Sequence, residues 1–85
     1  MRIIRTDSFK RDYNKLPHSI QKQVDRKLGF FLTNPRHPSL QVKRIHGYEN
    51  LWEGRVTQNY RFLFSWLKDS FILLRVGPHH LVDRL

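Results

Sequence analysis

The sequence contains no cysteine, so it can form neither a disulfide bond nor a metal site built on thiolates. Small domains without disulfides are typical of reducing compartments. Long apolar runs are missing too: no stretch reaches the roughly 18–20 apolar residues that cross a bilayer. No apolar run typical of a signal peptide follows the N-terminal residues. We therefore expect one domain over residues 1–85, in the cytoplasm and not in a membrane.

Acidic residues are also scarce. Seven Asp and Glu side chains stand against 16 Lys and Arg, which gives a formal net charge of +9 with neutral histidines. Self-repulsion of this size opposes folding, so it indicates a polyanionic partner such as nucleic acid, an anionic membrane surface or an acidic protein. The plainer alternative is a basic surface that serves solubility alone. RNA is the favoured partner. A membrane surface is disfavoured, because no segment combines a basic face with a long amphipathic helix.

The first half of the sequence has helical periodicity. Thr6 or Asp7 can cap a helix that Pro17 ends. Ser19 can cap a second helix, which Asn34-Pro35 stops because the residue before a proline avoids helical backbone angles. The predicted apolar faces are Phe9, Tyr13 and Leu16 in the first helix, and Ile20, Val24, Leu28 and Phe31, widened by Phe30 and Leu32, in the second.

The rest of the chain alternates as strands do. Ile3-Ile4 predicts a short edge strand, and turns are predicted at 47–50 and 68–70. Four further strands are predicted over residues 40–45, 51–57, 60–67 and 71–76. The order β-α-α-β-β-β-β predicts an α+β fold, in which a two-helix hairpin packs on one face of a mainly antiparallel sheet.

The register of the last three strands follows from their apolar rows, because a slip of one residue would bury arginines. Turns centred near residues 58 and 69 predict the cross-strand pairs Arg55–Arg61, Glu53–Leu63, Arg75–Leu63 and Gly77–Arg61. The helices are expected to cover Trp52, Val56, Phe62, Phe64, Trp66, Ile72 and Leu74. The opposite face is expected to carry Glu53, Arg55, Arg61 and Arg75, and Gly77-Pro78 brings His79 beside Arg61.

Glu53, Arg61 and His79 are suitable groups for cleaving RNA without a metal. The reaction needs a base for the 2′-hydroxyl, a cation for the charge that develops on the phosphorus, and an acid for the leaving 5′-oxygen. The guanidinium of Arg61 can hold two phosphate oxygens, and the imidazole of His79 can move a proton near neutral pH. The alternative is structural: Glu53 pairs with Arg55 or Arg61 on an exposed face, which contributes little.

A second basic stretch consists of Lys43, Arg44 and His46, with Tyr48 and Trp52 nearby. Such a stretch can hold phosphates and stack bases, but it can also be a solvated strand edge with Trp52 in the core, and for Trp52 the core is favoured. No pair of histidines has the spacing of metal ligands with acidic support, so neither a metal nor a cofactor is expected.

Two segments carry a resemblance to a known family. They are Leu51-Trp52-Glu53-Gly54-Arg55-Val56 with the following Tyr60-Arg61-Phe62-Leu63-Phe64, and Ile72-Leu73-Leu74-Arg75-Val76-Gly77-Pro78-His79. Together with the N-terminal helical hairpin they resemble bacterial toxins of the RelE/ParE superfamily, and the Gly-x-His ending resembles the YafQ-type branch.

The resemblance implies a microbial RNase fold, metal-independent cleavage of mRNA on the ribosome, and neutralisation by an acidic antitoxin. By position, Arg61 matches the strand arginine that contacts phosphate, and His79 matches the C-terminal catalytic histidine. Glu53 matches an acidic or polar active-site position. In this interpretation Arg55 or Arg75 helps Arg61 to clamp the phosphate, and Glu53 or a neighbouring basic residue assists removal of the 2′-proton. Lys43, Arg44 and His46 bind RNA. Two alternatives stay open: a non-catalytic, ParE-like toxin that binds DNA gyrase, and an inactive relative kept as a regulator.

Overall fold

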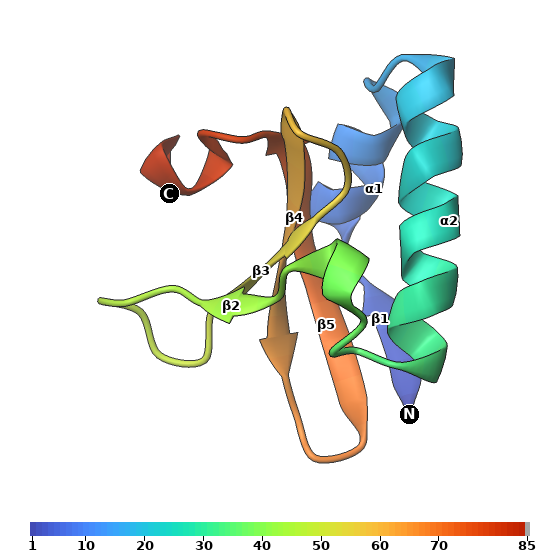
Figure 1. Ribbon diagram of the computed structural model, residues 1–85. Coiled ribbons are helices and arrows are strands. Elements are labelled where there is room, and N and C mark those ends of the chain that lie inside the picture. Colours follow the sequence, from blue (N-terminus) through green and yellow to red (C-terminus); the bar gives the residue numbers. More distant parts are fainter. Residues whose placement is uncertain (85) are drawn as a thin grey trace.

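Strands and helices form two layers in the computed structural model, which describes residues 1–84 (Figure 1). Helices α1 (Asp7–Asn14) and α2 (His18–Thr33) lie on one face of the sheet. The strands are β1 (Arg2–Arg5), β2 (Lys43–Arg44), β3 (Trp52–Arg55), β4 (Tyr60–Trp66) and β5 (Ser70–Pro78), and the 3-10 helices are η1 (Pro38–Leu40) and η2 (Leu81–Arg84). The sheet order is β1-β5-β4-β3-β2, with β1 parallel to β5 and the other neighbours antiparallel. The predicted α+β fold is confirmed.

The helix boundaries follow local chemistry. The Thr6 hydroxyl accepts a hydrogen bond of 3.2 Å from the backbone N–H of Phe9, which caps α1 as predicted. The cap residue of α2 is Pro17, without a side-chain hydrogen bond, so the predicted cap at Ser19 is wrong. Proline is tolerated there because the first N–H groups of a helix have no helical partner. The helix ends at Thr33, directly before Asn34-Pro35.

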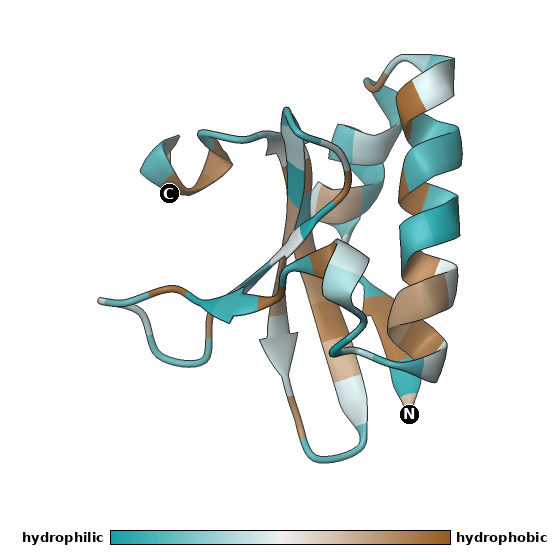
Figure 2. Ribbon diagram, viewed as in Figure 1, coloured by the Kyte–Doolittle hydropathy of each residue, from teal (hydrophilic) through white to brown (hydrophobic). Residues whose placement is uncertain are grey.

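The main core lies between the helices and the sheet (Figure 2). From α2 it takes Val24, Leu28 and Phe31, as the periodicity predicts, whereas Leu32 is 49% exposed and does not belong to the apolar face. The ring of Phe31 meets the rings of Phe62, Phe64 and Phe71 at centroid distances of 5.4, 4.8 and 4.1 Å. Aromatic packing therefore joins α2 to the middle of the sheet. No helix within residues 1–84 is long and apolar enough to cross a membrane.

The predicted strand over residues 40–45 is largely wrong. Only Lys43 and Arg44 pair with β3, while the buried Leu40 belongs to η1. His37 accepts a hydrogen bond of 3.2 Å from the backbone N–H of Ser39, and proline occupies the first position of η1. Gln41 then takes a left-handed φ of 44°, which breaks the extended backbone before β2.

The predicted register of β3, β4 and β5 is confirmed around the polar residues. Arg55 pairs with Arg61, Glu53 and Arg75 both pair with Leu63, and Gly77 pairs with Arg61. The predicted facing of the first half of β5 is wrong: Phe71 and Leu73, not Ile72 and Leu74, are buried in the main core.

A β-bulge explains this difference. Phe64 pairs with Leu73 and Leu63 pairs with Arg75, so Leu74 is an extra residue without a partner on β4. One extra residue reverses the alternation of side chains between the two faces. The apolar row of β5 therefore changes parity within the strand, and no regular period-2 pattern can describe it.

Candidate functional site

Glu53 lies in β3 on the sheet face opposite the helices, and it is only 8% exposed. Its Oε1 lies 3.7 Å from Lys43 Nζ, on the edge strand β2, and 3.8 Å from Arg61 Nε, on β4. The expected alternative pairing of Glu53 with Arg61 is therefore present. A poorly hydrated carboxylate needs such compensation, because burial of an unpaired charge is costly.

Arg61 folds back onto the turn between β3 and β4. Its Nη1 donates to the backbone oxygens of Thr57, Gln58 and Tyr60 at 2.6, 3.0 and 3.0 Å. These bonds fix the guanidinium plane while using one of its two terminal nitrogens. Within residues 1–84 no hydrogen bond uses Nη2, so the group retains donors for an anion.

His79 follows the end of β5 and is exposed. Its backbone N–H donates to the oxygen of Asn59 at 2.7 Å, in the same turn that holds Arg61. Its ring meets the ring of His80 edge to face, at a centroid distance of 5.3 Å. The turn at residues 57–59 therefore brings Arg61 and the backbone of His79 to one end of the sheet.

Arg75 differs from the sequence expectation. Its Nε and Nη2 donate to the carboxylate oxygens of Asp12 at 2.6 and 3.1 Å, a two-pronged contact with α1. The hydrogen bond to Asp12, together with the charge of Asp12, raises the pKa of the Arg75 guanidinium against a smaller opposing effect of burial. The guanidinium is thus engaged by a carboxylate instead of lying beside Arg61 on the open face.

The remaining basic residues of the prediction lie along the β2 and β3 side of the sheet. Lys43 and Arg44 form β2, His46 is exposed in the loop that follows, and Arg55 ends β3. Burial lowers the pKa of Lys27 in α2, and the charges of Arg26 and Arg55 add to this effect. The charge of Arg55 therefore acts on Lys27 of α2, as the smallest of these three effects.

Trp52 belongs to the core side, as favoured from the sequence. It packs partly buried against the main cluster, and its indole N–H donates to Asn50 Oδ1 at 3.1 Å. The guanidinium of Arg36 lies 5.6 Å from the ring centroid of Trp52 and 5.0 Å from that of Trp66.

A second apolar cluster covers part of the face that the sequence predicted to be polar. Figure 1 shows η2 on the opposite side of the sheet from the helices. Leu81 of η2, 5% exposed, packs with the buried Leu51 and Leu63, and with the partly buried Ile45, Leu74 and Val82. The sequence contained a signal for this cover. Leu63 lies on the same sheet face as Arg61 in the predicted register, and a leucine there would be exposed unless another apolar residue covered it.

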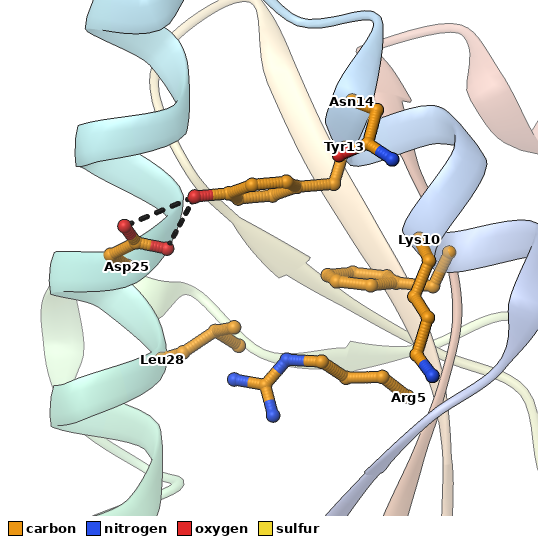
Figure 3. A pocket seen from close by; sticks show the side chains of 7 residues that line it. Arg5, Lys10, Tyr13, Asn14, Asp25 and Leu28 are labelled. Atoms are coloured by element: carbon orange, nitrogen blue, oxygen red, sulfur yellow. Dashed lines mark hydrogen bonds between the residues drawn. The ribbon is translucent and has the colours of Figure 1, made fainter.

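Two of the hollows that the described residues form lie beside the helices. One of about 370 Å³ lies between α1, α2 and β1, where the Tyr13 hydroxyl donates to Asp25 at 2.9 Å, as Figure 3 shows. Burial, and after it the hydrogen bond to Asp25, raises the pKa of Tyr13. The other, of about 270 Å³, lies between the end of α1 and the end of β5, and its lining includes Asp12, Arg75 and Pro78. Among residues 1–84 no group of three or more His, Cys, Asp or Glu side chains could hold a metal ion.

Comparison with solved structures identifies the fold of this chain, whereas comparison of its sequence with known families finds no match. No family model matches the sequence, and no curated protein matches it. Solved structures do match: RelE in the RelB–RelE antitoxin–toxin complex of Methanococcus jannaschii has a TM-score of 0.78 at 23% identity, with 95% of each chain covered. The chain has the fold of the RelE-type toxins.

Two further RelE-type structures agree with this assignment. YafQ from E. coli has a TM-score of 0.74 at 12% identity, covering 96% of this chain and 98% of YafQ. The YoeB/ParE toxin from Agrobacterium tumefaciens has a TM-score of 0.75 at 16% identity, covering 93% of this chain and 99% of the toxin. The predicted resemblance to RelE/ParE toxins is therefore confirmed at the level of the fold.

Proposed function

We propose that this protein is the toxin of a type II toxin–antitoxin pair, and that it is a metal-independent endoribonuclease that cleaves mRNA on the ribosome. One observation carries the proposal: a single turn, residues 57–59, binds both Arg61 and the backbone of His79, and Arg61 in turn contacts Glu53. The guanidinium of Arg61 and the backbone of His79 therefore share one turn, and Glu53 Oε1 lies 3.8 Å from Arg61 Nε. The RelE-type fold supports it.

In the proposed reaction, Arg61 binds the scissile phosphate through Nη2. Its fixed positive charge stabilises the negative charge that develops at the phosphorus. Glu53 accepts the proton of the 2′-hydroxyl, whose oxygen attacks the phosphorus. His79 donates a proton to the 5′-oxygen as the bond from phosphorus to that oxygen breaks. The products are a 2′,3′-cyclic phosphate and a 5′-hydroxyl. Arg55, Lys43, Arg44 and His46 bind neighbouring phosphates, whereas Arg75 does not take part because Asp12 holds it.

The net charge of +9 suits the same proposal. An antitoxin that neutralises this protein in the cytoplasm is expected to be acidic, because opposite charge accelerates and strengthens association. RelE of Methanococcus jannaschii, whose structure is similar to this one, was solved together with RelB.

The test is cleavage of mRNA on purified, programmed ribosomes. We expect His79→Ala to lower the cleavage rate at least 100-fold, the low end of the range for a general acid, and the fragments of the parent to carry 2′,3′-cyclic phosphates. His18→Ala is the matched control, because His18 is exposed at the start of α2, and it should cleave like the parent.

Two results contradict the proposal. One is equal cleavage by the parent and by His79→Ala. The other is inhibition of DNA gyrase by both proteins with mRNA left intact, which would favour the non-catalytic, ParE-like alternative.

A further inference from the structure

Asp12 makes contacts that neither the core nor the proposed reaction explains. It is in the last turn of α1, and its Oδ2 accepts hydrogen bonds from Arg75 Nε at 2.6 Å and from the backbone N–H of Val76 at 3.2 Å. Its Oδ1 accepts a third from Arg75 Nη2 at 3.1 Å. One carboxylate therefore binds both the side chain and the backbone of β5, more than 60 residues away in the sequence.

These bonds lie on the edge of β5 that faces away from β4, beyond the end of β1. β1 pairs with β5 only over Ser70–Leu73, and Thr6 extends that edge with hydrogen bonds from its N–H and its hydroxyl to the oxygen of Leu73. Beyond Leu73, β5 has no neighbouring strand on that side within residues 1–84. Asp12 takes the place of a strand there, because it satisfies the N–H of Val76 at the free edge.

The free edge is also the segment that delivers His79. Gly77 and Pro78 pair with Arg61 and Tyr60 of β4, but on the side away from β4 no strand pairs with this part of β5 within residues 1–84, and Pro78 has no N–H to donate. On the β4 side the Asn59 oxygen binds the N–H of His79. On the opposite side, Asp12 and Arg75 provide the last attachment before Gly77.

We propose that Asp12 is a positioning residue: through Arg75 and Val76 it fixes the end of β5, and thereby sets the place of the His79 imidazole. The expected effect of Asp12 on the rate rests on the proposed function. The expected effect of Asp12 on the position of the end of β5 does not. Asp12 touches no substrate in this account. It holds the strand so that His79 reaches the leaving oxygen, and misplacement by about 1 Å can cost a catalyst on the order of 100-fold.

The experiment compares two aspartates that both link elements. Asp12→Asn removes the charge that binds Arg75, and Asp25→Asn weakens the hydrogen bond between Tyr13 of α1 and Asp25 of α2 (Figure 3). Arg75→Ala is a second variant that tests the same contact. It removes the side-chain bonds from Arg75 to Asp12 and keeps the bond from the Val76 N–H to Asp12. Cleavage on programmed ribosomes gives kcat and KM, thermal unfolding gives stability, and NMR follows the His79 ring and the amides of residues 76–79.

We expect Asp12→Asn to lower kcat on the order of 10- to 100-fold with KM within about twofold, to shift the His79 ring signals and to speed hydrogen exchange at Val76. Arg75→Ala should give a smaller fall in kcat. Asp25→Asn should leave kcat and the His79 signals unchanged even where its loss of thermal stability equals that of Asp12→Asn.

Equal effects of the two aspartate variants on kcat, or unchanged His79 signals in Asp12→Asn, overturn the positioning role. A parent protein that does not cleave RNA overturns the proposed function instead. In that case the NMR signals of His79 and Val76 alone decide whether Asp12 positions the strand end.

Discussion

Gly54 shows how one missing side chain shapes the sheet. It is buried in β3, opposite Phe62 on β4, and a β-carbon at position 54 would overlap the Phe62 ring. That ring is fully buried in the main core and lies 5.4 Å from the ring of Phe31. Glycine is required at position 54 for this close approach, not for an unusual backbone angle.

Gly54→Ala is therefore expected to destabilise the protein by about 1–3 kcal/mol, because the Phe62 ring must shift within a close-packed core. Gly29→Ala is the matched control. Gly29 is exposed in α2 with nothing within 4 Å of an added β-carbon, so alanine there should stabilise by about 0.5–1 kcal/mol through helix propensity. Urea unfolding of the two variants measures both changes. Effects of the same sign would contradict the packing argument.

At the scale of residues, the sequence predicted the polar register and, as one alternative, the pairing of Glu53 with Arg61, but it did not predict the partner of Arg75. Arg55, Arg61 and Gly77 fall where alternation and turn positions put them, since period 2 is a local rule. The pair of Asp12 and Arg75 was not predicted, because no local pattern joins residues so far apart in the chain. The bulge at Leu74 was also missed: an apolar run that reads Phe-Ile-Leu-Leu fits either parity.

At the scale of elements, η2 is the piece whose role the sequence left unassigned. Leu81 packs on Leu63 and Leu51 across the sheet from the helices, and the Leu81 side chain lies 3.3 Å from where a β-carbon of Gly77 would be. The C-terminal segment thus covers apolar residues that would otherwise face water. It also fixes the chain after His79 to the sheet.

Leu81→Ala should cost at least about 2 kcal/mol, at the low end of the range for removing a buried leucine, since this second cluster is small. Leu67→Ala is the control: Leu67 is 44% exposed and its truncation should change stability by less than about 0.5 kcal/mol. Chemical denaturation followed by tryptophan fluorescence measures both. Equal free energies of unfolding for the two variants would show that η2 does not contribute to the folded sheet.

The elements differ in how well their sequence signals predict them. α2 was predicted with its C-terminal boundary because 16 residues carry a sustained apolar period and a proline stop. β2 was overestimated, since a two-residue edge strand is held by its pairing with β3 and not by its own alternation. Tertiary pairing, which no single segment encodes, decided its length.

At the scale of the whole molecule, the positive charge divides into groups with different neighbours. Arg61 and Lys43 surround Glu53 on the open face, Arg75 is bound to Asp12, and most lysines and arginines of α1 and α2 are exposed. The total of +9 indicates binding to a polyanion that weakens with added salt. In the proposed reaction, Arg61 and Glu53 act with His79, and the exposed basic residues of the helices take no part.

The central claim is that His79 and Arg61 act together on mRNA. The most direct measurement maps RNA ends across the transcripts of cells after induction of the parent protein, of His79→Ala and of His18→Ala. The account predicts new mRNA ends on translated regions with the parent and with His18→Ala, and few or none with His79→Ala at equal protein level. New ends of equal abundance with His79→Ala, or growth arrest by the parent without new mRNA ends, would contradict it.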